Sequence, residues 1–164
     1  MDSKVYKPRD ISTIVCQSSN KSKRNIKGVI ALTGKSSIGK SSTLHELIDR
    51  LIPRLVPSKP KDVRVLFTYN GNLILVCTAG DDRKLVEENS KLAETIQPDV
   101  FVTAVNFNEG ATRAFDYYAE EMKEYSYVQL KINKGDLNNK SKGTVAQQNA
   151  FAANELKTII DAII

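Results

Sequence analysis

Residues 34–41 constrain this chain more than any other part of its sequence. They read Gly-Lys-Ser-Ser-Ile-Gly-Lys-Ser, which fits the pattern G-x-x-x-x-G-K-[S/T] at every fixed position. The preceding run, residues 28–33, is apolar and predicts a buried strand, and residues 41–52 carry leucine and isoleucine at helical spacing. A strand, a glycine-containing loop and a helix in this order predict a loop that binds a phosphate group.

Each part of this loop has a physical role in holding a polyphosphate. Gly34 and Gly39 permit a tight turn that aims several N–H groups inward, and the positive end of the following helix attracts an anion. Lys40 is expected to reach the terminal phosphates, and the Ser41 hydroxyl is expected to bind Mg²⁺. The predicted phosphate-binding residues are Gly34, Lys35, Ser36, Ser37, Ile38, Gly39, Lys40, Ser41 and Ser42. The alternative is a Gly/Ser turn ahead of an ordinary helix.

The composition predicts a globular protein without a membrane-spanning segment. The chain has 164 residues, of which 41% are hydrophobic and 26% are charged, values that are ordinary for a globular domain. Its N-terminus lacks an apolar signal segment, so a cytoplasmic location is expected. Cys16, Cys77 and the single histidine, His45, cannot form a structural zinc site unaided. Cys77 follows an apolar run and is expected to be a buried thiol.

The charge distribution separates a basic N-terminal arm, residues 1–27, from a nucleotide-binding domain, residues 28–164. The arm contains seven basic and two acidic side chains, so it carries the whole net charge of +5. Such an arm can bind nucleic acid or another polyanion, or it can be a solvated tail. Residues 10–16 within it have the composition of a short edge strand. A protein partner is a further possibility.

The order of the remaining segments predicts an α/β fold with three layers. Asn70-Gly71 stands between two β-rich runs and is typical of a hairpin turn, so we expect a mostly parallel sheet with one antiparallel hairpin strand. Ligands in such sheets lie beyond the carboxyl ends of the strands. The predicted strands are 28–33, 63–69, 73–77, 99–105 and 127–132; the later helices are 83–97, 113–125 and 145–164; and residues 106–112 and 133–144 are predicted loops.

Two acidic residues follow the second hairpin strand and are candidates for the metal site. Asp81 and Asp82 would support Mg²⁺, and Glu109 is a second choice. The alternative for Asp81 and Asp82 is to cap the next helix and to place negative charge in its first turn, and one residue can serve each purpose. Arg113 would stabilise charge on a transferred phosphate, or it would pair with a surface acid. Lys40, Asp81 and Arg113 are therefore the predicted catalytic residues.

These residues resemble the P-loop NTPase superfamily over residues 28–136, which implies a three-layer P-loop sandwich with Mg²⁺ and a nucleoside triphosphate as cofactors. The chain also resembles small bacterial P-loop proteins known only as ATP-binding. Shared features are the hairpin followed by Gly80-Asp81, an apolar strand over 99–104, and Gly110-Ala-Thr112 in the loop after it. This second likeness implies nucleotide binding without a defined reaction.

A third likeness is to the Ras-like small GTPases. Asn133-Lys134-Gly-Asp136 resembles the guanine-reading Asn-Lys-x-Asp of that family, and the hairpin leads to Cys77-Thr-Ala-Gly80 where the family has Asp-x-x-Gly. The resemblance implies that Asn133, Lys134 and Asp136 bind the base of GTP. The chain departs from the family at Cys77, which replaces the aspartate on the magnesium side, and it lacks a final strand followed by Ser-Ala-Lys.

The sequence therefore predicts a protein that binds a Mg²⁺–nucleoside triphosphate, with ATP ahead of GTP, and hydrolyses it slowly as a switch or an accessory ATPase. The alternatives are a small GTPase-like protein and a kinase of a small molecule or nucleoside. A kinase needs a lid, and residues 53–62, which contain three prolines, and 134–144 are the candidate segments. Residues 53–62 are equally consistent with a plain linker.

Overall fold

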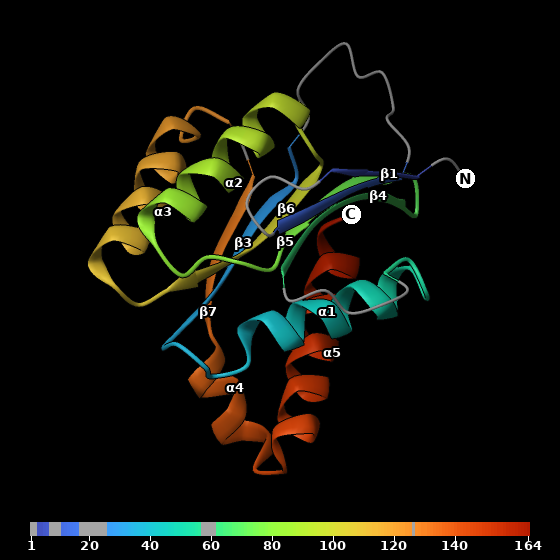
Figure 1. Ribbon diagram of the computed structural model, residues 1–164, viewed down its shortest axis with the longest axis vertical. Coiled ribbons are helices and arrows are strands. Elements are labelled where there is room, and N and C mark those ends of the chain that lie inside the picture. Colours follow the sequence, from blue (N-terminus) through green and yellow to red (C-terminus); the bar gives the residue numbers. More distant parts are fainter. Residues whose placement is uncertain (1–2, 7–10, 17–25, 57–61, 126) are drawn as a thin grey trace.

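Seven strands form one sheet whose two faces are both covered by helices (Figure 1). The computed structural model describes residues 3–6, 11–16, 26–56, 62–125 and 127–164. The strands are β1 (Ser3–Tyr6), β2 (Ile11–Cys16), β3 (Gly28–Gly34), β4 (Asp62–Tyr69), β5 (Asn72–Cys77), β6 (Val100–Asn106) and β7 (Val128–Asn133). The helices are α1 (Lys40–Leu51), α2 (Arg83–Ile96), α3 (Glu109–Glu121), α4 (Lys134–Ser141) and α5 (Val145–Ile163).

The strand order is β1-β2-β4-β5-β6-β3-β7. The four strands β5, β6, β3 and β7 are mutually parallel, so their carboxyl ends lie along the same edge of the sheet. β4 pairs antiparallel with β5 through a turn in which Asn70 and Gly71 have φ values of 48° and 76°. This positive φ at both central positions confirms the predicted hairpin. β6 is inserted between β5 and β3, which could not be read from the sequence.

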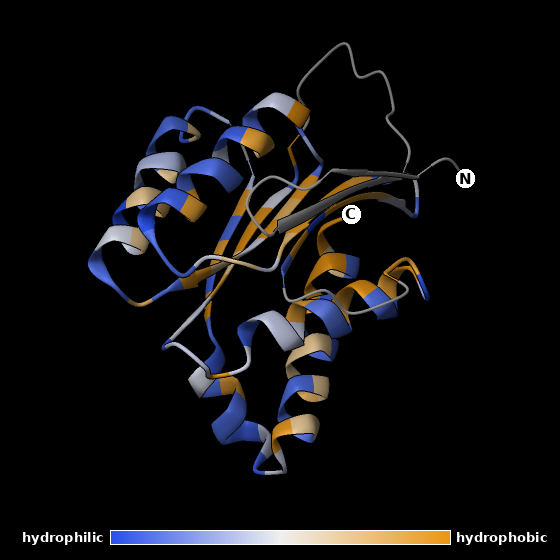
Figure 2. Ribbon diagram, in the orientation of Figure 1, coloured by the Kyte–Doolittle hydropathy of each residue, from blue (hydrophilic) through white to orange (hydrophobic). Residues whose placement is uncertain are grey.

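Two apolar layers hold the helices to the sheet. β3 is buried over most of its length because alternate residues face opposite layers: Ile30 and Leu32 pack with α1 and α5, whereas Val29 and Ala31 pack with α2 and α3. This burial on both faces explains why the strand is continuously apolar in sequence. Figure 1 shows α1, α4 and α5 on one side of the sheet and α2 and α3 on the other. Figure 2 shows mostly hydrophobic residues along the central strands, and helices that carry both hydrophobic and hydrophilic residues.

The structure corrects two predictions near the edge of the sheet. The predicted loop 133–144 is mostly helix α4, which has almost no apolar periodicity because only Leu137 and Lys134 are buried. α3 begins at Glu109 rather than 113, because the Asn108 side chain caps it by accepting from the Ala111 amide. The loop between β6 and α3 is therefore much shorter than predicted.

The predicted basic segment contributes strands to the sheet. β2 lies close to the predicted strand 10–16, but it is not at the edge, since β1 pairs with it on its outer side. The other basic positions between these strands and residue 26 lie outside the described residues. Within the described part of the chain, no helix is long and apolar enough to cross a membrane.

Candidate functional site

The loop of residues 34–39 between β3 and α1, called the phosphate loop after its predicted ligand, has the backbone shape that its glycines predict. Gly39 immediately precedes α1 with φ 96°, and a Cβ there would lie 2.5 Å from Oδ1 of Asn149. Gly34 ends β3 with φ 157°, and a Cβ there would lie 2.9 Å from the Ile38 side chain. Ser37 also has positive φ, at 62°. The N-cap of α1 is Gly39, which has no side chain to cap the helix, so the first amide groups of α1 are open to an anionic ligand.

The Lys40 ammonium lies inside the curve of the loop. Only 5% of the residue is exposed, and Nζ donates to the carbonyl oxygens of Gly34 at 2.9 Å and Lys35 at 2.6 Å. Burial lowers the pKa of Lys40, and the negative charge of Asp81 acts in the opposite direction. The main-chain carbonyls of the loop thus hold the Lys40 ammonium in place, and the Asp81 carboxylate is close enough to interact with its charge.

The Ser41 hydroxyl connects α1 to the central strands of the sheet. Its Oγ donates to the Thr78 carbonyl at 2.9 Å and contacts Oδ1 of Asp62 at 3.4 Å. Thr78 follows β5 and is fully buried, with its own Oγ1 accepting from the Val63 amide at 2.8 Å. The first residues of β4 are therefore fixed against the end of β5, next to the hydroxyl predicted to bind a metal.

Four successive carbonyl groups after β5 each accept a hydrogen bond from a different part of the fold. Oγ of Ser41 donates to Thr78, Nδ2 of Asn89 to Ala79 at 2.7 Å, the main-chain N–H of Asn106 to Gly80 at 2.8 Å, and Nδ2 of Asn108 to Asp81. The donors come from α1, α2, the end of β6 and the loop that follows it. Hydrogen bonds thus hold the main chain of residues 78–81 along its whole length, and this fixes the backbone position of Asp81.

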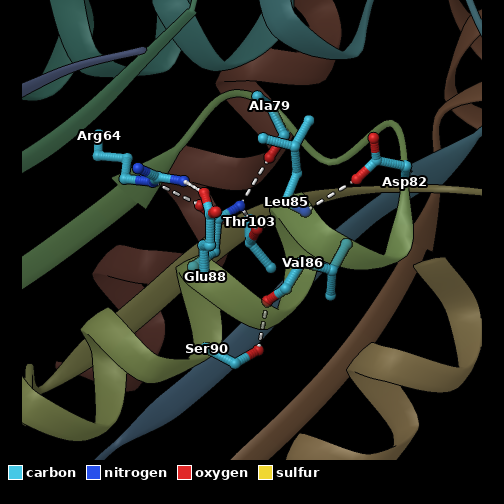
Figure 3. A network of polar contacts seen from close by, with 9 residues as sticks. Arg64, Ala79, Asp82, Leu85, Val86, Glu88, Ser90 and Thr103 are labelled. Atoms are coloured by element: carbon cyan, nitrogen blue, oxygen red, sulfur yellow. Dashed lines mark hydrogen bonds and ion pairs between the residues drawn. The ribbon is translucent and has the colours of Figure 1, made fainter. Parts of the chain in front are cut away.

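The two candidate aspartates have different positions. Asp82 is the N-cap of α2, and its Oδ1 accepts from the Leu85 amide at 2.9 Å (Figure 3). Asp81 is exposed, lines the same pocket as the phosphate loop and interacts with the charge of Lys40. The carboxylate of Asp82 is thus used to begin a helix, whereas Asp81 faces the site.

A buried polar network supports this segment from behind (Figure 3). Arg64 on β4 is 5% exposed, and it donates from Nε to Oδ1 of Asn89 at 2.7 Å and from Nη2 to Glu88 at 3.1 Å. Asn89 in turn donates to Ala79 and contacts the Thr103 hydroxyl at 3.4 Å. The amide of Asn89 therefore joins β4, α2, β6 and the segment that precedes Asp81.

The end of β6 also contacts the phosphate loop. Nδ2 of Asn106 donates to the Ser36 hydroxyl at 2.7 Å, and the Phe107 amide donates to the Gly34 carbonyl at 3.1 Å. The sequence placed Asn106 at the carboxyl end of a strand but did not include it among the site residues. Its position beside the loop follows from the insertion of β6 next to β3, which no local pattern indicates.

A pocket of about 270 Å³ opens at this edge of the sheet. Its lining residues come from the phosphate loop, the ends of β5 and β6, and α5: Ser37, Gly39, Lys40, Ser41, Ser42, Thr78, Asp81, Ala104, Val145 and Asn149. Asn149 is 8% exposed, and its Oδ1 accepts from the Thr43 hydroxyl at 3.3 Å. Helix α5, distant in sequence, thus forms one wall of the pocket.

Arg113 does not line this pocket. It forms an ion pair with Glu109 at 2.6 Å, one turn away on α3, and the two side chains are 79% and 73% exposed. This is the surface pairing that was the alternative to a catalytic role. Glu109, the second-choice metal carboxylate, is used in the same pair.

The segment that resembles a guanine-reading motif forms the start of α4. Oδ1 of Asn133 caps this helix by accepting from the Gly135 amide at 2.8 Å, and the buried Lys134 ammonium donates to Asn138. Burial lowers the pKa of Lys134. A Cβ on Gly34 would lie 3.6 Å from Cβ of Lys134, so α4 packs against the phosphate loop. Asp136 is exposed and is not among the residues that line the pocket.

The donor set fits Mg²⁺ rather than a softer metal. A hydroxyl and two carboxylates, those of Ser41, Asp62 and Asp81, are the hard oxygen groups that Mg²⁺ prefers. Among the described residues, no group of three or more His, Cys, Asp and Glu side chains could hold a metal ion.

Comparison with protein-family models gives no match, and neither do comparisons with curated proteins and with solved structures.

Proposed function

We propose that this protein binds a Mg²⁺–nucleoside triphosphate in the pocket between the phosphate loop and the segment after β5. The observation that carries the proposal is that the loop main chain encloses the Lys40 ammonium at the first residue of α1, directly after the N-cap Gly39. A helix N-terminus with inward amide groups and a lysine beside it is a site for a polyphosphate. The fold is then that of a P-loop NTPase sandwich.

In this proposal, different residues bind the phosphate groups and the metal ion. The amide groups of residues 35–41 and the Lys40 ammonium would neutralise the phosphate oxygens, and the Ser41 hydroxyl would turn from the Thr78 carbonyl to the metal. Asp81 would hold a water of the metal, since it faces the same pocket. When bound, Mg²⁺ supplies positive charge that stabilises the transferred phosphoryl group. Slow hydrolysis, as a switch or an accessory ATPase, is the activity that we propose.

We favour ATP over GTP, because two of the residues that would have to bind guanine already form other contacts within the protein. Asn133 uses its side-chain oxygen to cap α4, and Lys134 is buried and bonded to Asn138.

Cys77, at the position of the magnesium-side aspartate of the Ras-like family, is fully buried. Burial raises the pKa of its thiol to about 12, so Cys77 remains a neutral thiol and does not serve a metal.

The proposal is tested by calorimetric titration with ATP, GTP, ADP and GDP, each with and without Mg²⁺, followed by measurement of phosphate release. We expect binding of ATP with Mg²⁺ and slow release of phosphate. Lys40→Ala should weaken binding by about tenfold or more, because it removes charged hydrogen bonds. A preference for GTP that Asp136→Ala abolishes would replace the ATP assignment. Absence of binding by all four nucleotides would overturn the proposal.

A further inference from the structure

The carboxylate of Asp62 lies beside the hydroxyl that would bind the metal, although the two residues are far apart in sequence. Oδ1 of Asp62 is 3.4 Å from Oγ of Ser41, and the same Oγ is 2.9 Å from the Thr78 carbonyl. Three oxygen atoms from α1, β4 and the end of β5 therefore meet at one point. No sequence pattern singles out Asp62, because it stands at the end of a proline-rich connection.

The backbone around Asp62 holds it in this place. Val63 is paired with Thr78 on both sides, since its N–H donates to the Thr78 hydroxyl at 2.8 Å and its carbonyl accepts from the Thr78 amide at 3.0 Å. Asp62 directly precedes this pairing and is half-buried. Its side chain is consequently presented to Ser41 from β4, and Ser41 in turn lines the pocket that Asp81 lines from the segment after β5.

A bound cation would compensate the negative charge of Asp62. None of the described basic residues forms an ion pair with Asp62 or Asp81 within 4.0 Å. Two carboxylates beside a triphosphate would repel it, and a divalent cation between them would remove that repulsion. Carboxylates and a hydroxyl are also ligands of the kind that Mg²⁺ takes, often through its waters.

We propose that Asp62 is the second carboxylate of the Mg²⁺ site and that it makes triphosphate binding dependent on the metal. This inference rests on the proposed function, because it concerns the metal of the same nucleotide. Asp62 is assigned a holding role, directly or through a water of the ion. In the absence of metal, its charge opposes the nucleotide.

The test is calorimetric titration of wild type and Asp62→Asn with ATP, once with excess Mg²⁺ and once with EDTA. With Mg²⁺ we expect the substitution to weaken ATP binding by about tenfold, because a ligand charge is lost. With EDTA we expect binding to be unchanged or tighter, because a repulsive charge is lost. Opposite effects in the two conditions would not arise from a merely structural role, which would weaken binding in both.

Asp82→Asn is the matched control, because it makes the same change of charge nearby and asparagine also serves as an N-cap. It should leave both affinities unchanged. Asp62→Glu provides a second variant in case Asp62→Asn folds poorly, and it should raise the Mg²⁺ concentration needed for half-maximal ATP binding. Wild-type affinity in both variants at every Mg²⁺ concentration would overturn this inference alone. Failure of the wild type to bind ATP at all would instead overturn the proposed function.

Discussion

Gly80 lies directly against the main chain of Ala104, so closely that a Cβ on Gly80 would stand 1.7 Å from the Ala104 carbonyl oxygen. The main-chain N–H of Asn106 donates to the Gly80 carbonyl at 2.8 Å, which fixes the two segments at this separation. The neighbour is backbone in a buried strand, so it cannot move aside as a flexible side chain could. This contact sets the position of the segment that carries Asp81.

Gly80→Ala should therefore lower the free energy of unfolding by about 3 kcal/mol, as expected for overpacking against rigid backbone. Urea unfolding monitored by circular dichroism measures the change. Gly71→Ala is the control, because Gly71 has positive φ but no atom within 4 Å of an added Cβ, and it should lose only about 1 kcal/mol. Equal losses in the two variants would show that the contact with Ala104 is not the cause.

Asn89→Leu should destabilise the protein by about 3 kcal/mol or more, because it leaves buried polar groups without partners. The Arg64 guanidinium would lose its 2.7 Å contact, and the Ala79 carbonyl would lose its donor. Denaturant unfolding measures this loss. Asn154→Leu, on the exposed surface of α5, is the comparison and should change stability by less than about 0.5 kcal/mol. A mild effect at Asn89 would mean that the network in Figure 3 contributes little.

Substitutions at Asp81 and Asp82 should affect different properties, ATP affinity for Asp81 and stability for Asp82. Asp82→Ala removes an N-cap and should cost about 1 kcal/mol of stability while ATP affinity stays the same. Asp81→Asn should leave stability within about 0.5 kcal/mol of wild type and should weaken binding of ATP with Mg²⁺. Thermal unfolding and calorimetry on both variants measure the two properties. Reversed effects would exchange the roles assigned here.

Cys77 should be almost inert to alkylation in the folded protein. Its pKa of about 12, raised by burial against the opposing charge of Arg64, keeps the thiolate scarce at pH 8. In a Cys16→Ser background, so that only one thiol is read, iodoacetamide should react at least about a hundredfold more slowly with the folded than with the urea-unfolded chain. Similar rates would contradict the burial of this thiol.

The same shift predicts how stability depends on pH. Folding raises the pKa of Cys77 above its ordinary value of 9.0 to about 12, so the folded state retains a proton that the unfolded state loses. The stabilisation is complete below pH 9 and is lost as pH rises from 9 to 12. Cys77→Ala should make the free energy of unfolding fall less steeply over this range. An identical slope in urea titrations from pH 8 to 11 would count against the assignment.

The sequence predicted those parts of the fold that local chemistry determines. Buried strands such as β3 and β6 are continuously apolar, and Asn70-Gly71 specifies its hairpin through positive φ. The strand order was not predictable, because the placement of β6 between β5 and β3 depends on how whole elements pack. Helix α4 was missed because its sequence is polar and its burial is limited to Leu137 and Lys134.

The candidate site was likewise predictable only where its residues are adjacent in sequence. Residues 34–42 are adjacent in sequence, so their pattern was visible as a motif. Asn89, Asn106 and Asn149 join the site only through tertiary packing, and asparagine is common enough that no local pattern marks it. Asp62 is in the same position, since its contact with Ser41 spans 21 residues.

The central claim, that the loop amides and Lys40 close around a polyphosphate, is tested most directly by amide NMR of the labelled protein during titration with ATP and Mg²⁺. The largest shifts should fall on the amides of residues 35–42, smaller shifts should occur at Thr78 and Asp81, and Lys40→Ala should greatly reduce all of them. Unchanged amides in residues 35–42 at saturating nucleotide, or shifts confined to another surface, would contradict this claim.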